Sequence, residues 1–547
     1  MSSCHIPRRE FLALSSVAAA GVALGGPRRV WAIPSRSRRA VASFAPPLFD
    51  PERMRMLATT AIEAATHAGA QFADIRLNEL REYAPNFNED GSLTVTFAYG
   101  IRVRVDGREA FVGGTDSTPD GVIRIAQAAV AAARDHAKVS GLARPLVPTP
   151  VVKGEWTSPV KIDPFAISPE DHVVVHNGLT LWMRRWPIGL VGWLTWQAET
   201  RVFASSEGSL VTQRTTRVHQ GWGIEVAISR YPRPDGHFYI PGISPQTAGV
   251  EAMLGDALHV PLEAAADDLT QLMTYPSGRA EVGRKDVVLD GHAFGTVLGY
   301  TVVPALMLGR ALGEEQDSEG TSFLAPPAAV VGQALFAPAL NLWVESAVPY
   351  YGAAQWDDEG VATRTVPLIE GGVVQRYLGT RANAGTLTPE TPERSTAGTA
   401  ADASTPGATL GVAYANDVLS LPAARPGTLA VRPASSGPSL AELARTLHDG
   451  YLIRNAFNFV IDRQETGGAI IPSLMFEVRD GEIRRRILRT RLEFSTKKLF
   501  RNILALGGPN SVTTVNQWLT GGLPWNAARS VLQAPAAAVK DVNIVVN

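Results

Sequence analysis

A helical repeat followed at once by strand-like alternation sets the fold class of the first part of this chain. In residues 51–70, the apolar residues Met54, Leu57, Ile62 and Ala65 recur at helical spacing and fall near one face. The stretches FADIRLNEL, LTVTFAYGIRVRVDG and EAFVGG then alternate between apolar and polar residues, as half-buried strands do. A second helical stretch, PDGVIRIAQAAVAAARDHA, follows them. Helix, strands and helix in this order predict an α+β domain.

The length and the later pattern predict a second domain. A chain of 547 residues is too long for one ordinary core, and 45% apolar with 19% charged residues is a globular composition. We expect an N-terminal domain over residues 51–276 and a largely β C-terminal domain over residues 277–547. In the second domain a strand and a helix precede a series of strands, and PLIEGGVVQRYL reads as a hairpin.

Two local signals add detail to this division. Ser168, with Asp171 three residues later, predicts the start of a helix through a capping box. Residues 384–440 are rich in Thr, Ala, Pro, Ser and Gly, which predicts a loose surface loop.

The N-terminus has the layout of a twin-arginine export signal. Arg8 and Arg9 precede an uncharged stretch rich in Ala, Gly and Leu, and a small-residue cleavage site ends at Ala32. We therefore expect residues 1–32 to be a signal peptide, residues 33–50 to be a linker, and the protein to reach the periplasm or cell envelope. An uncleaved amphipathic helix is the alternative. No membrane span is expected once the signal is removed, because the apolar stretch is short and Gly-rich.

Cysteine and charge counts exclude several functions. Cys4 is the only cysteine and lies within the predicted signal, so the mature chain would hold no disulfide and no thiolate nucleophile. The formal net charge of -1 argues against nucleic-acid binding over the whole surface. The chain also lacks G-x-S-x-G, which argues against a serine hydrolase elbow.

Several short segments, in order along the chain, resemble one known family. They are FADIRL with YGIRVRVDGREAFVGG, SPVKIDPFAIS, VFASSEGSLVTQ, GTSFLAP, WDDEGVATRTVPLIEGGVVQRYLGTRANAG and VKDVNIVV. Together they resemble the TldD/PmbA family of zinc peptidases, also called modulators of DNA gyrase. The most specific stretch is the block from Asp357 to Gly360 that continues to Glu370. The resemblance implies a two-domain α+β fold of the TldD/PmbA type.

The resemblance also implies where a zinc site would lie, and the sequence departs from it there. Active members carry H-E-x-x-x-H on a helix, with two His as zinc ligands and Glu as general base, and a Cys near the C-terminus as third ligand. Counting back from Gly320 in GTSF places Gly299, Tyr300 and Pro304 at these helix positions. The C-terminal Cys is missing too, and His292 is the only His between residues 260 and 447. We therefore expect no catalytic residues and no bound zinc at the family position, and we expect Pro304 to kink the helix.

The other candidate sites match no specific catalytic or metal-binding motif as closely. His172 and His176 are spaced to share one face of a helix, and a metal pair there is the alternative to an ordinary amphipathic helix. The acidic residues 314, 315, 317 and 319 read as a solvated loop after the helix. Trp182, Trp186, Trp193 and Trp196 are expected in the core rather than in a ligand platform.

Three functions are compatible with these observations. The leading one is a non-catalytic TldD/PmbA subunit that pairs with a zinc-bearing TldD-like chain, or with itself, in proteolysis of unfolded peptides. The second is an active hydrolase with a relocated metal site, such as one at His172 and His176. The third is a stand-alone peptide-binding protein of the cell envelope.

Overall fold

The computed structural model describes most of the chain beyond its N-terminal segment. The described residues are Phe44, 47–84, 91–136, 145–174, Arg185, 189–192, 194–218, 222–227, 237–241, 246–254, 256–346, Gly352, 354–386, 409–521 and 526–546. The predicted signal peptide lies outside them.

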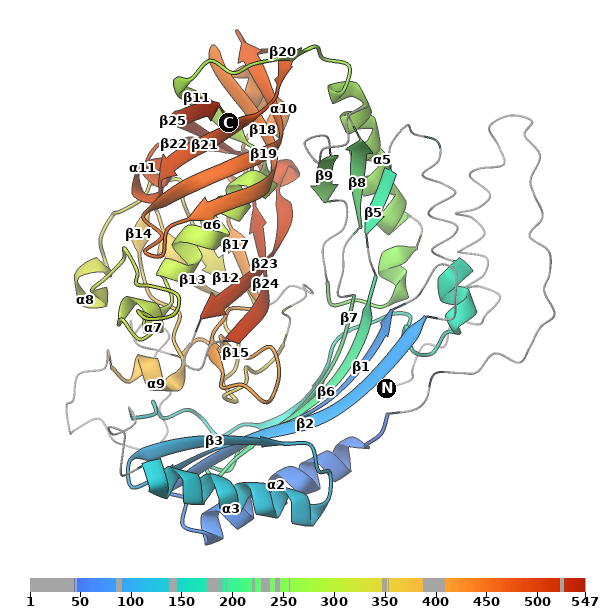
Figure 1. The fold of residues 1–547 in the computed structure, drawn as a ribbon, viewed down its shortest axis with the longest axis vertical. Coiled ribbons are helices and arrows are strands. Elements are labelled where there is room, and N and C mark those ends of the chain that lie inside the picture. Colours follow the sequence, from blue (N-terminus) through green and yellow to red (C-terminus); the bar gives the residue numbers. More distant parts are fainter. Residues whose placement is uncertain are drawn as a thin grey trace, which may run out of the picture.

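The N-terminal domain is a curved sheet with two helices on one face (Figure 1). In order across the sheet, its strands are β3 (Arg108–Gly114), β2 (Ser92–Val105), β1 (Phe72–Ala84), β6 (Trp196–Ser205), β7 (Leu210–Val218) and β4 (Lys153–Thr157). The helices are α2 (Pro51–His67) and α3 (Pro119–His136). Asp50 caps α2 by accepting from the amide of Glu52, and Pro51 occupies its first turn, where no intrahelical donor is needed.

Side-chain alternation along β1 divides the two faces of this sheet. Ala73, Ile75 and Leu77 are buried against α2 and α3, in one apolar core. Asp74, Arg76 and Asn78 point to the opposite face, where the C-terminal domain lies (Figure 1). A strand that is apolar on one face and charged on the other, yet buried on both, must find polar partners in the second domain.

A smaller group of elements connects the two domains. It contains a sheet of β5 (Gly189–Gly192), β8 (Trp222–Ala227) and β9 (His237–Pro241), the 3-10 helix η2 (Val250–Met253) and helix α5 (Asp256–Leu272). Ser168 accepts from the amide of Asp171 at 3.1 Å and donates to its carboxylate at 2.8 Å, which confirms the predicted helix start.

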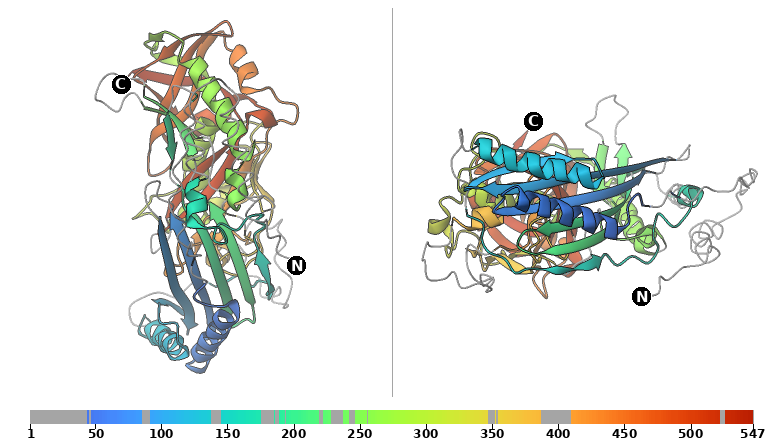
Figure 2. Two further views of the ribbon diagram at one scale, coloured as in Figure 1. Left: turned by 90° about the vertical axis from the view of Figure 1, so that its right-hand side faces the viewer. Right: turned by 90° about the horizontal axis from the view of Figure 1, so that it is seen from below.

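The C-terminal domain contains two further sheets, and Figure 2 shows it stacked along the long axis on the N-terminal sheet. The first has the order β10 (Ser277–Gly278), β20 (Glu482–Ile487), β19 (Gly467–Arg479), β18 (Asp449–Ile461), β11 (Gly283–Leu289), β25 (Ala537–Val546) and β21 (Thr490–Ser495), with β22 (Ile503–Leu506) on β25. The second has the order β14 (Val373–Val374), β13 (Val366–Glu370), β12 (Leu342–Val344), β17 (Thr428–Val431), β24 (Asn526–Ala534) and β23 (Thr513–Gly521).

Short elements complete this domain. They are α7 (Leu308–Ala311), α8 (Pro327–Val330), α9 (Arg381–Ala384), α10 (Leu440–Arg445), α11 (Thr496–Arg501), η4 (Pro509–Ser511), β15 (Ala413–Tyr414) and β16 (Ala423–Ala424). The predicted hairpin is confirmed as β13 and β14, joined by Gly371 and Gly372, whose φ values of 58° and 77° suit a tight hairpin turn.

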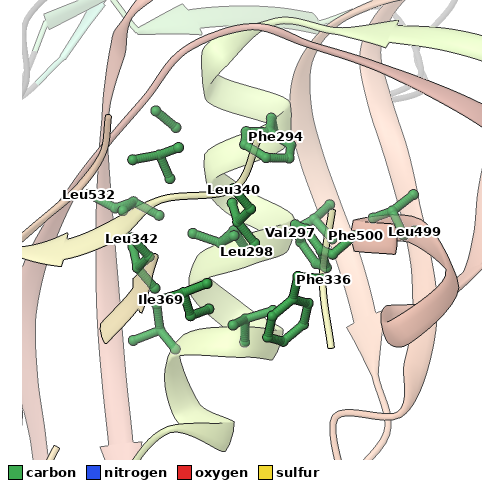
Figure 3. Close-up of a cluster of buried hydrophobic side chains, with 14 of the residues drawn as sticks. Phe294, Val297, Leu298, Phe336, Leu340, Leu342, Ile369, Leu499, Phe500 and Leu532 are labelled. Carbon is green, nitrogen blue, oxygen red and sulfur yellow. The ribbon is translucent and has the colours of Figure 1, made fainter. Parts of the chain in front are cut away.

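Helix α6 (Gly291–Ala305) contacts strands of both C-terminal sheets. It is apolar on all sides and buried nearly throughout, as expected of a helix inside a core. Figure 3 shows its residues among side chains from the second sheet and from α11; those labelled are Phe294, Val297, Leu298, Phe336, Leu340, Leu342, Ile369, Leu499, Phe500 and Leu532. The fold is thus α+β, with an N-terminal α+β domain and a largely β C-terminal domain, and no described helix has the length and hydropathy to cross a membrane.

Two sequence expectations need correction. The loose loop predicted over 384–440 is wrong for residues 409–431, which form β15, β16 and β17 and bury apolar residues such as Leu410 and Leu429; residues 387–408 lie outside the described part. The predicted linker is docked at Phe44, whose ring packs on Tyr83 at 4.6 Å. Pro304, expected to kink α6, stands one residue before the end of the helix at Ala305, and the missing prolyl N–H leaves the helix one hydrogen bond short in its last turn.

Candidate functional site

Helix α6 presents no metal ligand at the positions implied by the family resemblance. Its N-terminus is fixed by Asp290, which accepts from the amide of Ala293 at 2.8 Å. Gly299 is buried, and a Cβ at this position would overlap Oε1 of Gln517 on β23. Gln517 is 0% exposed, and its amide has no hydrogen-bond partner among the described residues. A second strand therefore fills the space into which a side chain at Gly299 would project.

The general-base position is also committed to packing. Tyr300 is half-buried, and its ring lies 4.2 Å from that of Phe459 on β18. Pro304 has no polar side-chain atom. Zinc in proteins is bound by thiolate, imidazole or carboxylate, and none of these is present at the three positions. Within the described ranges, no group of three or more His, Cys, Asp or Glu is arranged to hold a metal. The residues at this position do not fit zinc.

His172, the alternative ligand, is a core histidine. It is 3% exposed, and its ring packs against those of Tyr83 and Trp196 at 5.0 and 5.9 Å. Nε2 lies 2.8 Å from the carbonyl oxygen of Pro164, and burial lowers the pKa of His172 to about 4. Trp196 is 1% exposed, as predicted for a core tryptophan. The other residues of these two predictions lie outside the described residues: His176, Trp182, Trp186 and Trp193.

Beside the end of α6, the GTSF loop meets a buried cluster of charges. Ser322 donates to the carbonyl of Ala305 at 2.7 Å, which ties the loop to the helix. Arg310 is 5% exposed and forms ion pairs with three carboxylates, those of Glu315, Glu319 and Glu465. The predicted solvated loop is wrong for Glu315, which is 4% exposed, because Arg310 gives it a buried partner.

The chain segment at Asp357–Gly360 joins the two domains. Asp358 pairs with Arg76 and Arg201 of the N-terminal sheet, and Glu359 pairs with Arg102 at 3.0 Å. All five side chains are largely buried, so each charge depends on its partners rather than on water. We refer to these five residues as the interdomain ion cluster.

Next to this cluster lies a cleft with a volume of about 690 Å³. Its floor is the polar face of β1, β2, β6 and β7. Its roof includes the loop from Tyr414 to Leu419 and Arg529 of β24. Ser420 holds the end of the roof loop by accepting from Arg76 at 2.5 Å. Polar and charged side chains line the cleft together with apolar surface, so the cleft suits a ligand that has both hydrogen-bonding groups and apolar parts.

Charge pairs also shape the cleft floor. Glu199 is buried between Arg201 and Arg217, at 2.6 and 2.7 Å. Burial alone would raise the pKa of Glu199, but the two guanidinium groups outweigh it and lower the pKa to about 2. Burial and the nearby carboxylates raise the pKa of Tyr414 well above its usual range, so the roof phenol stays protonated.

The sequence alone does not reveal the cleft or the contact between Gly299 and Gln517, because the residues that meet there are distant in sequence. Asp357–Gly360 was recognised as a specific segment, but its partners Arg76, Arg102 and Arg201 lie more than 150 residues away. One signal was available: β1 and β6 carry charged residues at alternating positions on the face opposite their apolar core.

The comparisons with known proteins agree with this architecture. Residues 282–545 match the family described as PmbA/TldA metallopeptidase C-terminal domain. No curated protein sequence matches the chain. A proposed modulator of DNA gyrase from Thermotoga maritima is similar in structure, with a TM-score of 0.66 and 14% identity over 90% of this chain and 100% of that one.

Two other solved structures are similar to the same extent. A proposed modulator of DNA gyrase from Bacteroides thetaiotaomicron has a TM-score of 0.63 at 13% identity, over 90% of this chain and 99% of that one. TldE from Thermococcus kodakarensis has a TM-score of 0.64 at 15% identity, over 90% and 100%. At such identities these structures establish the fold.

Proposed function

The chain belongs to the TldD/PmbA family, and we propose that it is a non-catalytic subunit that pairs with a zinc-bearing homologue in the proteolysis of unfolded peptides. The observation that carries this proposal is the packing of Gln517 against Gly299. The first ligand position has no side chain, and a buried amide occupies the adjoining space. Tyr300 and Pro304 offer neither a general base nor a second ligand.

The role left to this chain is to hold and present peptide. The polar cleft between the domains is large enough for a short stretch of extended chain, and the interdomain ion cluster keeps its two walls together. Chemistry on the bound peptide would come from the partner, whose helix would carry the intact zinc motif. We also propose that the chain is exported by the twin-arginine route. That route carries proteins that fold before they cross the membrane.

Metal analysis of the purified chain provides the first test. We expect no stoichiometric zinc and no cleavage of an unstructured peptide by the chain alone. Addition of a TldD-like homologue with an intact H-E-x-x-x-H should give cleavage, and the two chains should co-purify. Replacing the first His of that homologue should abolish cleavage, whereas replacing Gly299 of this chain should not.

Two results would contradict the proposal. One tightly held zinc per chain, with peptide cleavage by the chain alone, would indicate an active hydrolase with its site elsewhere. Peptide binding without any association with a zinc-bearing homologue would indicate a stand-alone binding protein.

A further inference from the structure

The floor of the cleft is built from rows of side chains that run across four strands. The first row is Ala98, Asn78, Arg201 and Gln213, and the second is Thr96, Leu80, Glu199 and Thr215. In each row the residues are direct neighbours in the sheet, so their side chains stand close together on one face.

Most charged and amide groups of this floor are held by other protein groups. Arg201 binds Asp358 and Glu199. Gln213 donates to the carbonyl of Trp356 at 2.9 Å and accepts from the amides of Gln355 and Trp356 at 2.9 and 3.1 Å. These side chains are fixed, and they can offer a ligand little beyond shape and charge.

Asn78 differs from its neighbours in the first row. It is 8% exposed, it lines the cleft, and its Oδ1 has no hydrogen-bond partner among the described residues. On one side stands Ala98, whose side chain offers no hydrogen bond, and on the other stands Arg201, which is committed to carboxylates. A buried carbonyl oxygen without a partner is costly, and sites that bind polar ligands are a recurrent reason for such groups.

We propose that Asn78 is a peptide-binding residue of the cleft, which binds a main-chain peptide group of the polypeptide that enters it. This inference rests on the proposed function. A side-chain amide carries one acceptor and two donors with the spacing of a peptide group, so it forms two parallel hydrogen bonds with a peptide N–H and C=O. Recognition of this kind ignores side chains and suits a subunit that must accept unfolded peptides of varied sequence.

Binding of a fluorescein-labelled, unstructured Gly-Ser peptide to the full chain, followed by fluorescence anisotropy, tests the inference. Loss of two hydrogen bonds in Asn78→Leu should weaken binding about tenfold. The same peptide with N-methylated main-chain amides should bind the wild type about tenfold more weakly. It should bind the wild type and Asn78→Leu equally, because both changes remove the same contact.

Matched variants separate this effect from misfolding. Asn458→Leu changes an exposed Asn of β18 outside the cleft and should leave affinity unchanged. Asn78→Asp keeps the size of the side chain but removes its donors, and it should also weaken binding about tenfold. If the folded Asn78 variants bind both peptides as the wild type does, the inference is wrong while the proposed function stands. If the wild type binds no peptide, both fail.

Discussion

Gln517 packs directly against Gly299. Gln517 is fully buried, and its amide occupies the volume that any side chain at Gly299 would need. The space beside Gly299 is therefore filled by a residue of another strand. One substitution at Gly299 would not return an imidazole to a working position, because the adjoining space is filled.

Gly299→Ala should lower the free energy of unfolding by about 1 kcal/mol, and by at most about 2 kcal/mol. Alanine has the better helix propensity, by about 1 kcal/mol, but a Cβ at this position overlaps Gln517 and overpacking costs about 1–3 kcal/mol. Because Gln517 is 0% exposed, its side chain has little room to move away. Urea denaturation of the variant measures the change.

Gln517→Ala is the matched second variant for this pair. In the double variant, Gly299→Ala should become neutral or stabilising, because the overlap is gone and the helix propensity remains. A Gly299→Ala protein as stable as the wild type would show that Gln517 can relax, contrary to the packing argument.

At the level of secondary-structure elements, the β18–β19 turn closes over the GTSF loop. The amide of Phe323 donates to the carbonyl of Gln464 at 3.2 Å. Glu465 adopts a φ of 54° and directs its carboxylate into the cluster around Arg310. Two other carboxylates, Glu315 and Glu319, face the same guanidinium. Arg310 and the nearby Arg425 face three carboxylates, and burial favours the neutral form of Glu465, so a proton is retained there.

Glu465→Gln should reveal this proton through pH. Burial raises the pKa of Glu465 to about 8, despite Arg310. Between the ordinary Glu value of about 4.3 and this pKa, the folded state holds a proton that the unfolded state has lost. Stability of the wild type therefore falls as pH rises through this window, by at most about 1.4 kcal/mol per unit from this group.

The variant has no such proton, so its stability relative to the wild type should increase steadily from about pH 5 to about pH 8. Denaturant unfolding of both proteins at a series of pH values measures the difference. A difference that stays constant over this range would mean that Glu465 is ionised throughout.

The elements differ in how far the sequence alone could define them. Helix α2 and the β13–β14 hairpin follow from local periodicity and turn residues, and both were predicted correctly. The strands after residue 409 were missed because a composition rich in Ala, Thr and Pro is typical of loops. Of these strands, β17 is placed by pairing with β12 and β24, which are distant in sequence, while β15 and β16 pair with each other. The burial of Glu315 was missed for the same reason, since Glu465 and Arg310 meet only in the fold.

At the scale of the whole molecule, the interdomain ion cluster holds the C-terminal domain on the N-terminal sheet. Asp358 is its central anion: it pairs with Arg76 and Arg201 and accepts from the amide of Ala415 at 2.9 Å. Asp358→Asn should reduce the free energy of unfolding by about 3–5 kcal/mol, because it leaves two buried guanidinium groups with less negative charge. Chemical denaturation followed by tryptophan fluorescence measures this change.

An exposed ion pair provides the control for Asp358. Glu155 pairs with Arg55 at 2.6 Å but is 47% exposed, so Glu155→Gln should cost less than about 1 kcal/mol. Equal losses in the two variants would mean that the interdomain ion cluster is no stronger than a surface pair.

Acid should weaken the cleft through Glu199, and the sign follows from its lowered pKa. The folded-state pKa is about 2, whereas an unfolded Glu titrates near about 4.3. The stabilisation from Glu199 is complete above about pH 4.3 and is lost as pH falls towards 2, by at most about 1.4 kcal/mol per unit.

Glu199→Gln should be less stable than the wild type at neutral pH, because Arg201 and Arg217 lose a shared partner. The gap between the two proteins should close between about pH 4 and pH 2 in urea titrations. Other carboxylates titrate in the same range, but they affect both proteins alike, so a gap that does not change with pH would rule out Glu199 as an acid-sensitive contact of the cleft.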